Sequence, residues 1–293
     1  MYFTGFADEA APDIDGQIRA IQELGWNQIE SRSIDGKNLH DIPEDKFNEV
    51  ADKLDAAGIH VNCFGSAIGN WGHPITDPFE ITLEEVKRAI PRMHRLDSHL
   101  IRIMSYKPIL ENGPQDQMKE ERFRRLSIIT KMFLDEGIQP VHENCTNYGG
   151  LGWPFTIELV ENVPGLKLVF DTGNPVFDDD WTKPKPYPKE DSWEFYENVK
   201  EHVVYVHIKD GHFDKELSKM KFTYPGEGDG YVEKIVRDLI VNRGYDGGFS
   251  MEPHMGMIYH EQDARQASPE EKFQIFVEYG RRFEAIIRKI KGE

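Results

Sequence analysis

Short apolar runs alternate along this chain with longer stretches in which apolar residues recur every three or four positions. The apolar runs are mostly β-branched or aromatic, as buried parallel strands are. Loops with Gly, Asn or Asp follow most of them. The pattern predicts eight strands, at Tyr2–Phe6, Gln28–Glu30, His60–Phe64, Leu100–Met104, Gln139–Glu143, Lys167–Asp171, Val203–Ile208 and Gly248–Glu252.

The stretches between these runs have the periodicity of amphipathic helices. In the first of them, Ile14, Ile18, Ile21 and Leu24 fall on one helical face, and Gly25 follows as a C-terminal stop. The same reasoning predicts helices at Ile14–Leu24, Pro43–Ala57, Leu83–Leu96, Gln117–Glu136, Thr156–Val163, Ser192–His202, Tyr231–Arg243 and Pro269–Lys291.

Two of the helix starts carry capping sequences. Thr82 and Glu85 have the spacing of a capping box, which predicts a helix that begins after Thr82. Ser268 precedes Pro269, the arrangement of an N-cap serine with proline at the first helical position.

Eight strands that alternate with eight helices fit either an open doubly wound sheet or a closed barrel. Open sheets usually carry a glycine-rich phosphate turn after an early strand, and the sequence has none. Polar residues instead end the fifth to eighth strands, and a closed barrel brings such ends to one mouth. The sequence therefore predicts an α/β fold, a single (β/α)₈ TIM barrel domain over residues 1–293, with its active site at the C-terminal mouth of the strands.

Four metal-ligand side chains end consecutive apolar strands: Glu143, Asp171, His207 and Glu252. They are 28, 36 and 45 residues apart, each about one βα unit with its loop. One acid at a strand end is usually a helix cap or a surface residue, but four in succession indicate a shared site. Three carboxylates and an imidazole suit a divalent ion, which would also neutralise their repulsion. We expect one such ion, with Mn²⁺ as the first choice and Zn²⁺, Mg²⁺, Co²⁺ or Fe²⁺ as alternatives.

Composition narrows the choice of partners. The 35 basic and 52 acidic residues give a net charge of −17, which repels nucleic acid and anionic membranes, so neither is an expected partner. No long apolar run or basic leader is visible, so we expect a cytoplasmic protein. The two cysteines, Cys63 and Cys145, need not form a disulfide. A small-molecule substrate is expected, and a homo-oligomer is left open.

Four motifs around the strand ends point to a known superfamily. They are HEN at 142–144, FDTGN at 170–174, HIKD at 207–210 and MEPH at 251–254. Together they resemble the sugar phosphate isomerase/epimerase superfamily, the xylose isomerase-like TIM barrels, over nearly the whole chain. The resemblance implies that the four strand-end residues named above are metal ligands. It also implies that the two glutamates exchange a proton with the substrate, as in the epimerase members.

Two positions depart from the epimerase pattern. Epimerase members usually have a histidine three residues after the motif aspartate, where this chain has Asn174. They also have an arginine six residues after the motif histidine, where it has Phe213. Both departures favour other members of the superfamily, such as inosose dehydratases and keto-sugar lyases. The missing histidine at 174 and the negative charge argue against the endonuclease IV branch.

Further candidates surround the predicted mouth. Lys209 follows His207 by two positions and so points to the same side of the strand. It could polarise a substrate carbonyl, which makes it a candidate catalytic residue, or it could pair with a carboxylate. Trp71 and Trp153 lie in loops, where they could stack on a sugar or pack against the loop. The candidate substrate contacts are Glu30, Trp71, His142, Trp153, Asn174 and His254.

Three of these contacts have competing structural interpretations. Glu30 could accept a hydrogen bond from a substrate hydroxyl, or form an ion pair with Arg32 or Arg102. His142 faces away from the side of its strand-end neighbour if the strand is regular, which favours a structural role. His254 stands two residues beyond a metal-ligand candidate but could equally be a loop histidine.

These features predict a metal-dependent isomerase or epimerase of a carbohydrate-like α-hydroxy carbonyl compound. Glu143 and Glu252 would act as acid and base around a metal-stabilised cis-enediolate. The alternative is a lyase or dehydratase of a keto-sugar or keto-inositol, similar to inosose dehydratase, in which Lys209, His142 or His254 protonates the leaving group. A sugar-binding barrel without activity would not require both glutamates.

The segment Pro225–Gly230 resembles a phosphate cradle only in its glycine content. Its two acids would repel a phosphate, so we expect a turn followed by a helix N-cap. This favours an unphosphorylated substrate.

Overall fold

Eight parallel strands form a ring in the computed structural model, which describes residues 1–256 and 267–293. Each predicted strand is present to within one residue at each end. The strands of the ring are β1 (Tyr2–Gly5), β2 (Gln28–Ser31), β5 (His60–Phe64), β6 (Leu100–Ile103), β7 (Gln139–Glu143), β8 (Lys167–Asp171), β9 (Val203–Ile208) and β12 (Gly248–Met251).

The strands pair in the order β1-β12-β9-β8-β7-β6-β5-β2. The two ends of this order, β1 and β2, meet through an isolated parallel bridge between Phe6 and Glu30. In the part of the chain that the structure describes, no longer ladder joins these two strands. The predicted (β/α)₈ barrel is therefore confirmed, with a seam between its first two strands.

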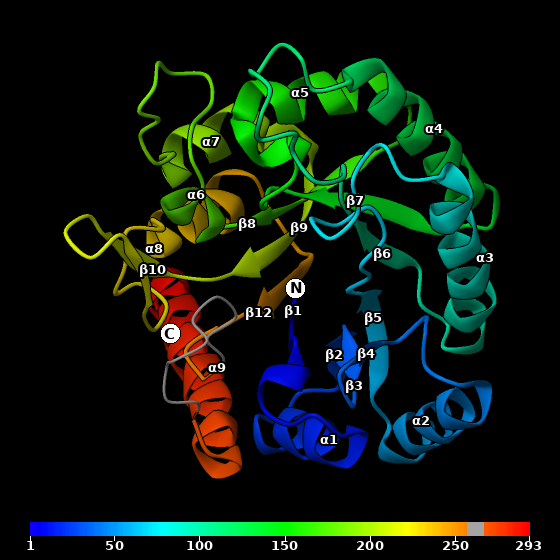
Figure 1. Ribbon diagram of the computed structural model, residues 1–293. Helices are drawn as coiled ribbons and strands as arrows, with labels where there is room; N and C mark the ends of the chain where they lie inside the picture. The colour runs from blue at the N-terminus through cyan, green and yellow to red at the C-terminus, as the bar shows by residue number, and fades with distance from the viewer. Residues whose placement is uncertain (257–266) are drawn as a thin grey trace.

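Helices cover the outside of the ring, and α9 lies against α1 (Figure 1). None of the described helices is long and apolar enough to cross a membrane. The α-helices are α1 (Ile14–Glu23), α2 (Glu44–Ala57), α3 (Phe79–Arg95), α4 (Lys119–Asp135), α5 (Trp153–Asn162), α6 (Asn174–Phe177), α7 (Ser192–Val199), α8 (Val232–Arg237) and α9 (Pro269–Lys291), with 3₁₀ turns at Ala7–Glu9, Tyr148–Leu151 and Lys200–His202 and a π turn at Asp238–Asn242.

The predicted cap of α9 is confirmed, and the predicted cap of α3 is wrong. At α9, the Ser268 hydroxyl accepts from the Glu271 backbone while the Glu271 side chain accepts from the Ser268 backbone. Helix α3 begins three residues before Thr82, after Pro78, and has no side-chain cap. Thr82 is buried inside the first turns, where its hydroxyl accepts from Tyr106 at 3.1 Å. The role of Thr82 is therefore a buried hydrogen bond between a loop and the helix, and not a helix cap.

Two short hairpins project from the ring and were not predicted. Their strands are only two to four residues long, below the length at which periodicity is informative. They are β3 (Ser33–Ile34) with β4 (Lys37–Asn38), and β10 (Gly211–Asp214) with β11 (Lys219–Phe222).

The glycine-rich segment Pro225–Gly230 wraps around a carboxylate of the chain itself. The backbone N–H groups of Gly226 and Gly228 donate to Oδ2 of Asp210 at 2.8 and 3.0 Å, and that of Gly230 donates to Oδ1 at 2.9 Å. The expected turn is present, but α8 begins without a side-chain cap, so the N-cap part of the prediction is wrong.

A small apolar layer fills the barrel beneath the mouth. Its buried members come from β5, β7, β8 and β9, and they are Cys63, Val141, Val169 and Tyr205. Strand side chains alternate in direction, so the residues two positions further along point to the next layer up. For β7, β8 and β9 those residues are the predicted ligands Glu143, Asp171 and His207.

Candidate metal centre

The structure brings the four predicted ligands together. One potential ligand atom from each of Glu143, Asp171, His207 and Glu252 lies within 4.8 Å of the others. All four residues are at most 3 % exposed. The first three are on β7, β8 and β9, and Glu252 directly follows β12. The barrel mouth therefore concentrates three carboxylates and one imidazole at a single point.

His207 is oriented by Glu30 on the far side of its ring. Nε2 lies 3.1 and 3.2 Å from the two Glu30 carboxylate oxygens, while Nδ1 lies 3.4 Å from Glu143 and 3.7 Å from Glu252. The Tyr205 hydroxyl also donates to Glu30, at 2.8 Å. A carboxylate on one ring nitrogen fixes the other as the ligand atom, the usual support for metal-bound histidine.

This role of Glu30 differs from both predicted ones. The side chain is fully buried, bonds to His207 rather than to Arg32 or Arg102, and does not line the mouth cavity. Burial would lower the pKa of His207, but Glu30 and Glu143 raise it to about 10. The ring is cationic in this arrangement, and a bound divalent ion would take the place of its Nδ1 proton.

Each glutamate at the mouth is held by an arginine, which sequence reasoning did not place in the site. Nη1 of Arg102 lies 3.0 Å from Glu143, and Nη1 of Arg32 lies 3.2 Å from Glu252. Burial alone would raise the pKa of Glu143, but Arg102 and His207 outweigh it and lower the pKa to about 2. The pKa of Glu252 is likewise held well below its usual range against burial, chiefly by Lys209.

Lys209 points into the site, as strand alternation predicted. Its ammonium group lies 3.1 Å from Asp171, 3.0 Å from Glu252 and 2.9 Å from Asn174. Burial raises the pKa of Asp171 to about 7, although Lys209 opposes this. In the described residues, Oδ2 of Asp171 and Oε2 of Glu252 accept no well-formed hydrogen bond, and both instead form ion pairs with the Lys209 ammonium group. Buried carboxylate oxygens without such bonds, beside an oriented imidazole, fit a divalent cation.

Three predicted substrate contacts line the mouth cavity, which has a volume of about 220 Å³: Asn174, His254 and Trp71. The Asn174 amide donates to Glu143 at 3.2 Å. His254 lies between Glu9 and Glu252, with Nδ1 2.8 Å and Nε2 3.4 Å from their respective carboxylates. Trp71 is 54 % exposed and so remains available to a ligand.

Two predicted contacts besides Glu30 lie outside this cavity. The His142 side chain is fully buried on the side of β7 that faces away from the mouth, where its Nε2 lies 3.0 Å from both Ser105 and Asn147. Burial lowers the pKa of His142 to about 4. Trp153 begins α5 and packs against the hydrophobic core. The regular pleat of β7 turns His142 away from the mouth, so we no longer expect either residue to contact a substrate directly.

Comparison with known proteins identifies the family. Residues 18–272 match the family described as xylose isomerase-like TIM barrel. The chain belongs to this family. No curated protein matches the chain.

Solved structures similar to this xylose isomerase-like barrel share its fold at low sequence identity. A D-tagatose 3-epimerase-like protein is 17 % identical, with a TM-score of 0.71 over 100 % of this chain and 99 % of the other. The probable 3-DHS dehydratase AsbF from Bacillus anthracis is 15 % identical, with a TM-score of 0.69 over 97 % and 99 %. A xylose isomerase-like TIM barrel protein from Mycobacterium smegmatis, solved with magnesium, is 15 % identical, with a TM-score of 0.68 over 99 % and 97 %.

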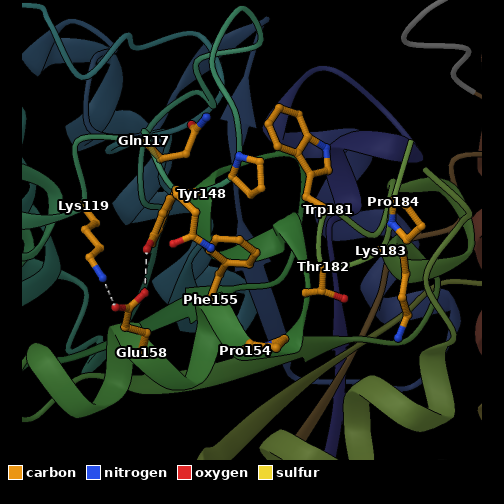
Figure 2. Close-up of a pocket in the computed structure, with 12 residues that line it drawn as sticks. Gln117, Lys119, Tyr148, Pro154, Phe155, Glu158, Trp181, Thr182, Lys183 and Pro184 are labelled. Carbon is orange, nitrogen blue, oxygen red and sulfur yellow. Dashed lines mark hydrogen bonds and ion pairs between the residues drawn. The ribbon is translucent and has the colours of Figure 1, made fainter. Parts of the chain in front are cut away.

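The xylose isomerase-like barrel also has a larger cavity, of about 590 Å³, beside α5 (Figure 2). Tyr148 and Phe155 line it opposite Trp181, and Glu158 accepts from Tyr148 at 3.0 Å and from Lys119 at 2.6 Å. None of the predicted ligands lines this cavity. The buried titratable groups converge instead at the smaller mouth cavity.

Proposed function

We propose that this protein is a divalent-metal-dependent isomerase or epimerase of a small, unphosphorylated, carbohydrate-like α-hydroxy carbonyl compound. Glu143, Asp171, His207 and Glu252 would hold the ion, with Mn²⁺ as the first choice. The observation that carries the proposal is the convergence of these four buried side chains, two of which are glutamates.

The protein's own groups supply the acid and base. Arg102 keeps Glu143 ionised, and Lys209, helped by Arg32, keeps Glu252 ionised. The two glutamates come from well-separated strands of the ring. One carboxylate can remove a proton from the substrate carbon and the other can return it. When bound, the metal ion supplies Lewis acidity toward the carbonyl and hydroxyl oxygens.

Substrate recognition is assigned to groups on the cavity wall. Lys209 and Asn174 face the cavity and can hydrogen-bond substrate oxygens, while Trp71 offers an apolar face to a sugar. A cavity of about 220 Å³ favours a small ligand. The glycine-rich segment Pro225–Gly230 is filled by Asp210, which supports an unphosphorylated substrate.

The relatives support this reaction class. Family membership and the similarity to a D-tagatose 3-epimerase-like protein favour a sugar epimerase or isomerase, and the magnesium in the Mycobacterium smegmatis structure favours a divalent ion.

The test is proton exchange at the substrate carbon. Protein loaded with Mn²⁺ is incubated with a panel of keto-sugars in D₂O and followed by NMR. Glu252→Gln should slow product formation by about 10²–10⁴-fold while deuterium still enters the substrate, because removal by Glu143 survives. The surface variant Glu194→Gln serves as the control. Wild-type turnover by Glu252→Gln at equal metal content, or no reaction with any polyol carbonyl compound, would contradict the proposal.

A lyase or dehydratase is the second candidate, and the position of Lys209 favours it. This buried ammonium group faces the mouth cavity, where it could protonate a leaving hydroxyl, and a dehydratase is among the similar structures. Mass spectrometry separates the candidates. An isomer has the substrate's mass in H₂O, whereas a dehydratase product is lighter by one water and its formation should fail in Lys209→Met.

A further inference from the structure

A second group of metal-ligand side chains lies outside the barrel mouth. His40 and Asp41 follow the β3–β4 hairpin, His73 is in the loop between β5 and α3, and Glu85 is on α3. One potential ligand atom from each of His40, Asp41 and Glu85 lies within 4.8 Å of the others. His73 lies against Glu85. None of the four contacts the candidate metal centre or takes part in the proposed reaction.

His40 and Glu85 are buried without the hydrogen bonds that burial normally requires. His40 is 0 % exposed, and within the described residues neither of its ring nitrogens has a hydrogen-bond partner. Oε2 of Glu85, a residue 6 % exposed, has none either. Leaving such groups unpaired is costly, so a fold that retains them calls for an explanation.

Two distances inside the group, one in each half of it, match those between ligands of one ion. Nε2 of His40 is 3.4 Å from Oδ2 of Asp41, and Nε2 of His73 is 3.5 Å from Oε1 of Glu85. A charge-assisted hydrogen bond would be shorter, at about 2.7–2.9 Å. Tetrahedral ligands at about 2.0–2.1 Å from Zn²⁺ are separated by about 3.3–3.5 Å.

The charged neighbours leave the ligand atoms available. Arg88 bonds to Oδ1 of Asp41 at 2.5 and 3.2 Å, while Oδ2 is the oxygen nearest His40. Arg92 donates to the backbone oxygens of Leu39 and Ile42.

We propose that His40, Asp41, His73 and Glu85 form a second, structural metal site that takes Zn²⁺. Two imidazoles and two carboxylates are a closed set of four ligands, as structural zinc sites have. His73 and Asp41 are 24 % and 39 % exposed in their side chains, which gives the ion a path from solvent.

A metal ion at this site would hold together two loops that help to form the wall of the barrel mouth. The chain near His40 carries Asn38, and the chain near His73 carries Asn70 and Trp71, and all three of these residues line the mouth cavity. A zinc ion shared by the two loops and α3 would fix the position of this wall. It would do so without contacting the substrate.

Metal counting on the full chain tests this inference. Wild-type protein is equilibrated with Zn²⁺, freed of unbound ion and measured by elemental analysis, with two equivalents expected. His73→Gln and Asp41→Asn, both at partly exposed positions, should each bind one equivalent and keep the wild-type far-UV circular dichroism. The matched control is His94→Gln, because His94 also faces a glutamate, Glu136 at 3.1 Å, but on the surface. It should retain both ions.

The variant Asp171→Asn separates this site from the mouth. It should lose the other equivalent, and Co²⁺ added to it should give the intense visible absorption of a tetrahedral site, which His73→Gln then removes. One wild-type ion that only Asp171→Asn removes would overturn the second site and leave the proposed function intact. One ion that only His73→Gln removes would support the second site and contradict a metal at the mouth. Zinc binding unchanged by His73→Gln and Asp41→Asn would also overturn the inference.

Discussion

At the scale of single residues, the candidate centre depends on side chains that never meet the reacting atoms. Glu30 is 0 % exposed and bonds to His207 from the side opposite the other ligands. Its carboxylate selects which ring nitrogen faces the site and limits rotation of the ring. The affinity of the mouth for a cation should therefore depend on Glu30 as well as on the ligands.

Replacing Glu30 tests this dependence. Glu30→Ala should weaken binding of Mn²⁺ by about 10–100-fold, the usual loss when the support of a metal-bound histidine is removed. Glu30→Gln, which keeps one acceptor oxygen, should lose less. Isothermal titration calorimetry of the metal measures both. Equal affinity in the wild type and Glu30→Ala would show that His207 needs no such support.

Strand alternation allowed the convergence of the four strand-end side chains to be predicted, but not their partners. Glu143 and Glu252 could be assigned to the mouth because each ends an apolar strand. The role of Glu30 could not be predicted, because its partner is 177 residues away and pairs with it only after the barrel closes. Arg32 and Arg102 were considered only as partners of Glu30, since sequence spacing does not reveal which acid an arginine reaches across the barrel.

At the scale of elements, α9 shows how a local sequence fixes a helix end. The capping box of Ser268 and Glu271 satisfies two backbone N–H groups, and Pro269 suits the first helical position. Ser268→Ala should lower the free energy of unfolding by about 1 kcal/mol, measured by urea denaturation. Ser127→Ala, on α4 and without a capping role, is the control and should change stability by less than about 0.5 kcal/mol. An equal effect of both substitutions would refute the capping argument.

Elements set by long-range contacts were harder to predict than α9. The start of α3 was misplaced because Thr82, which has a capping residue's chemistry, is used for a contact with Tyr106. Residues 225–230 were expected to cap α8, but their backbone groups bind Asp210 from before the β10–β11 hairpin. In both cases a polar group forms a hydrogen bond with a residue that is distant in the sequence.

At the scale of the whole molecule, the regular alternation of strands and helices was sufficient to predict the barrel. Eight strands were found within a residue of their predicted limits, because buried parallel strands are nearly continuous apolar runs. Substrate identity could not be predicted in the same way. Loop residues such as Trp71 and Asn70 line the mouth cavity, and no periodicity encodes their positions.

The net charge of −17 is also a property of the whole chain, and it predicts the behaviour toward nucleic acid. We expect no measurable binding of duplex DNA at physiological salt and no cleavage at abasic sites, because the phosphate backbone is repelled. A fluorescence anisotropy titration and an incision assay check this. Incision that disappears in His207→Ala would contradict the expectation and assign a nuclease activity to the mouth.

The seam between β1 and β2 has a consequence for the motions of the barrel. A closed sheet opens most readily between the two strands that share the fewest hydrogen bonds. Here those strands are β1 and β2, which meet through the bridge between Phe6 and Glu30. Glu30 also restrains His207, so a fluctuation that separates the two strands would loosen this predicted ligand on β9. A cation bound by His207 would in turn resist that fluctuation. Hydrogen exchange of the backbone amides along the seam should therefore slow when a cation occupies the mouth, because strand opening and cation binding would be coupled.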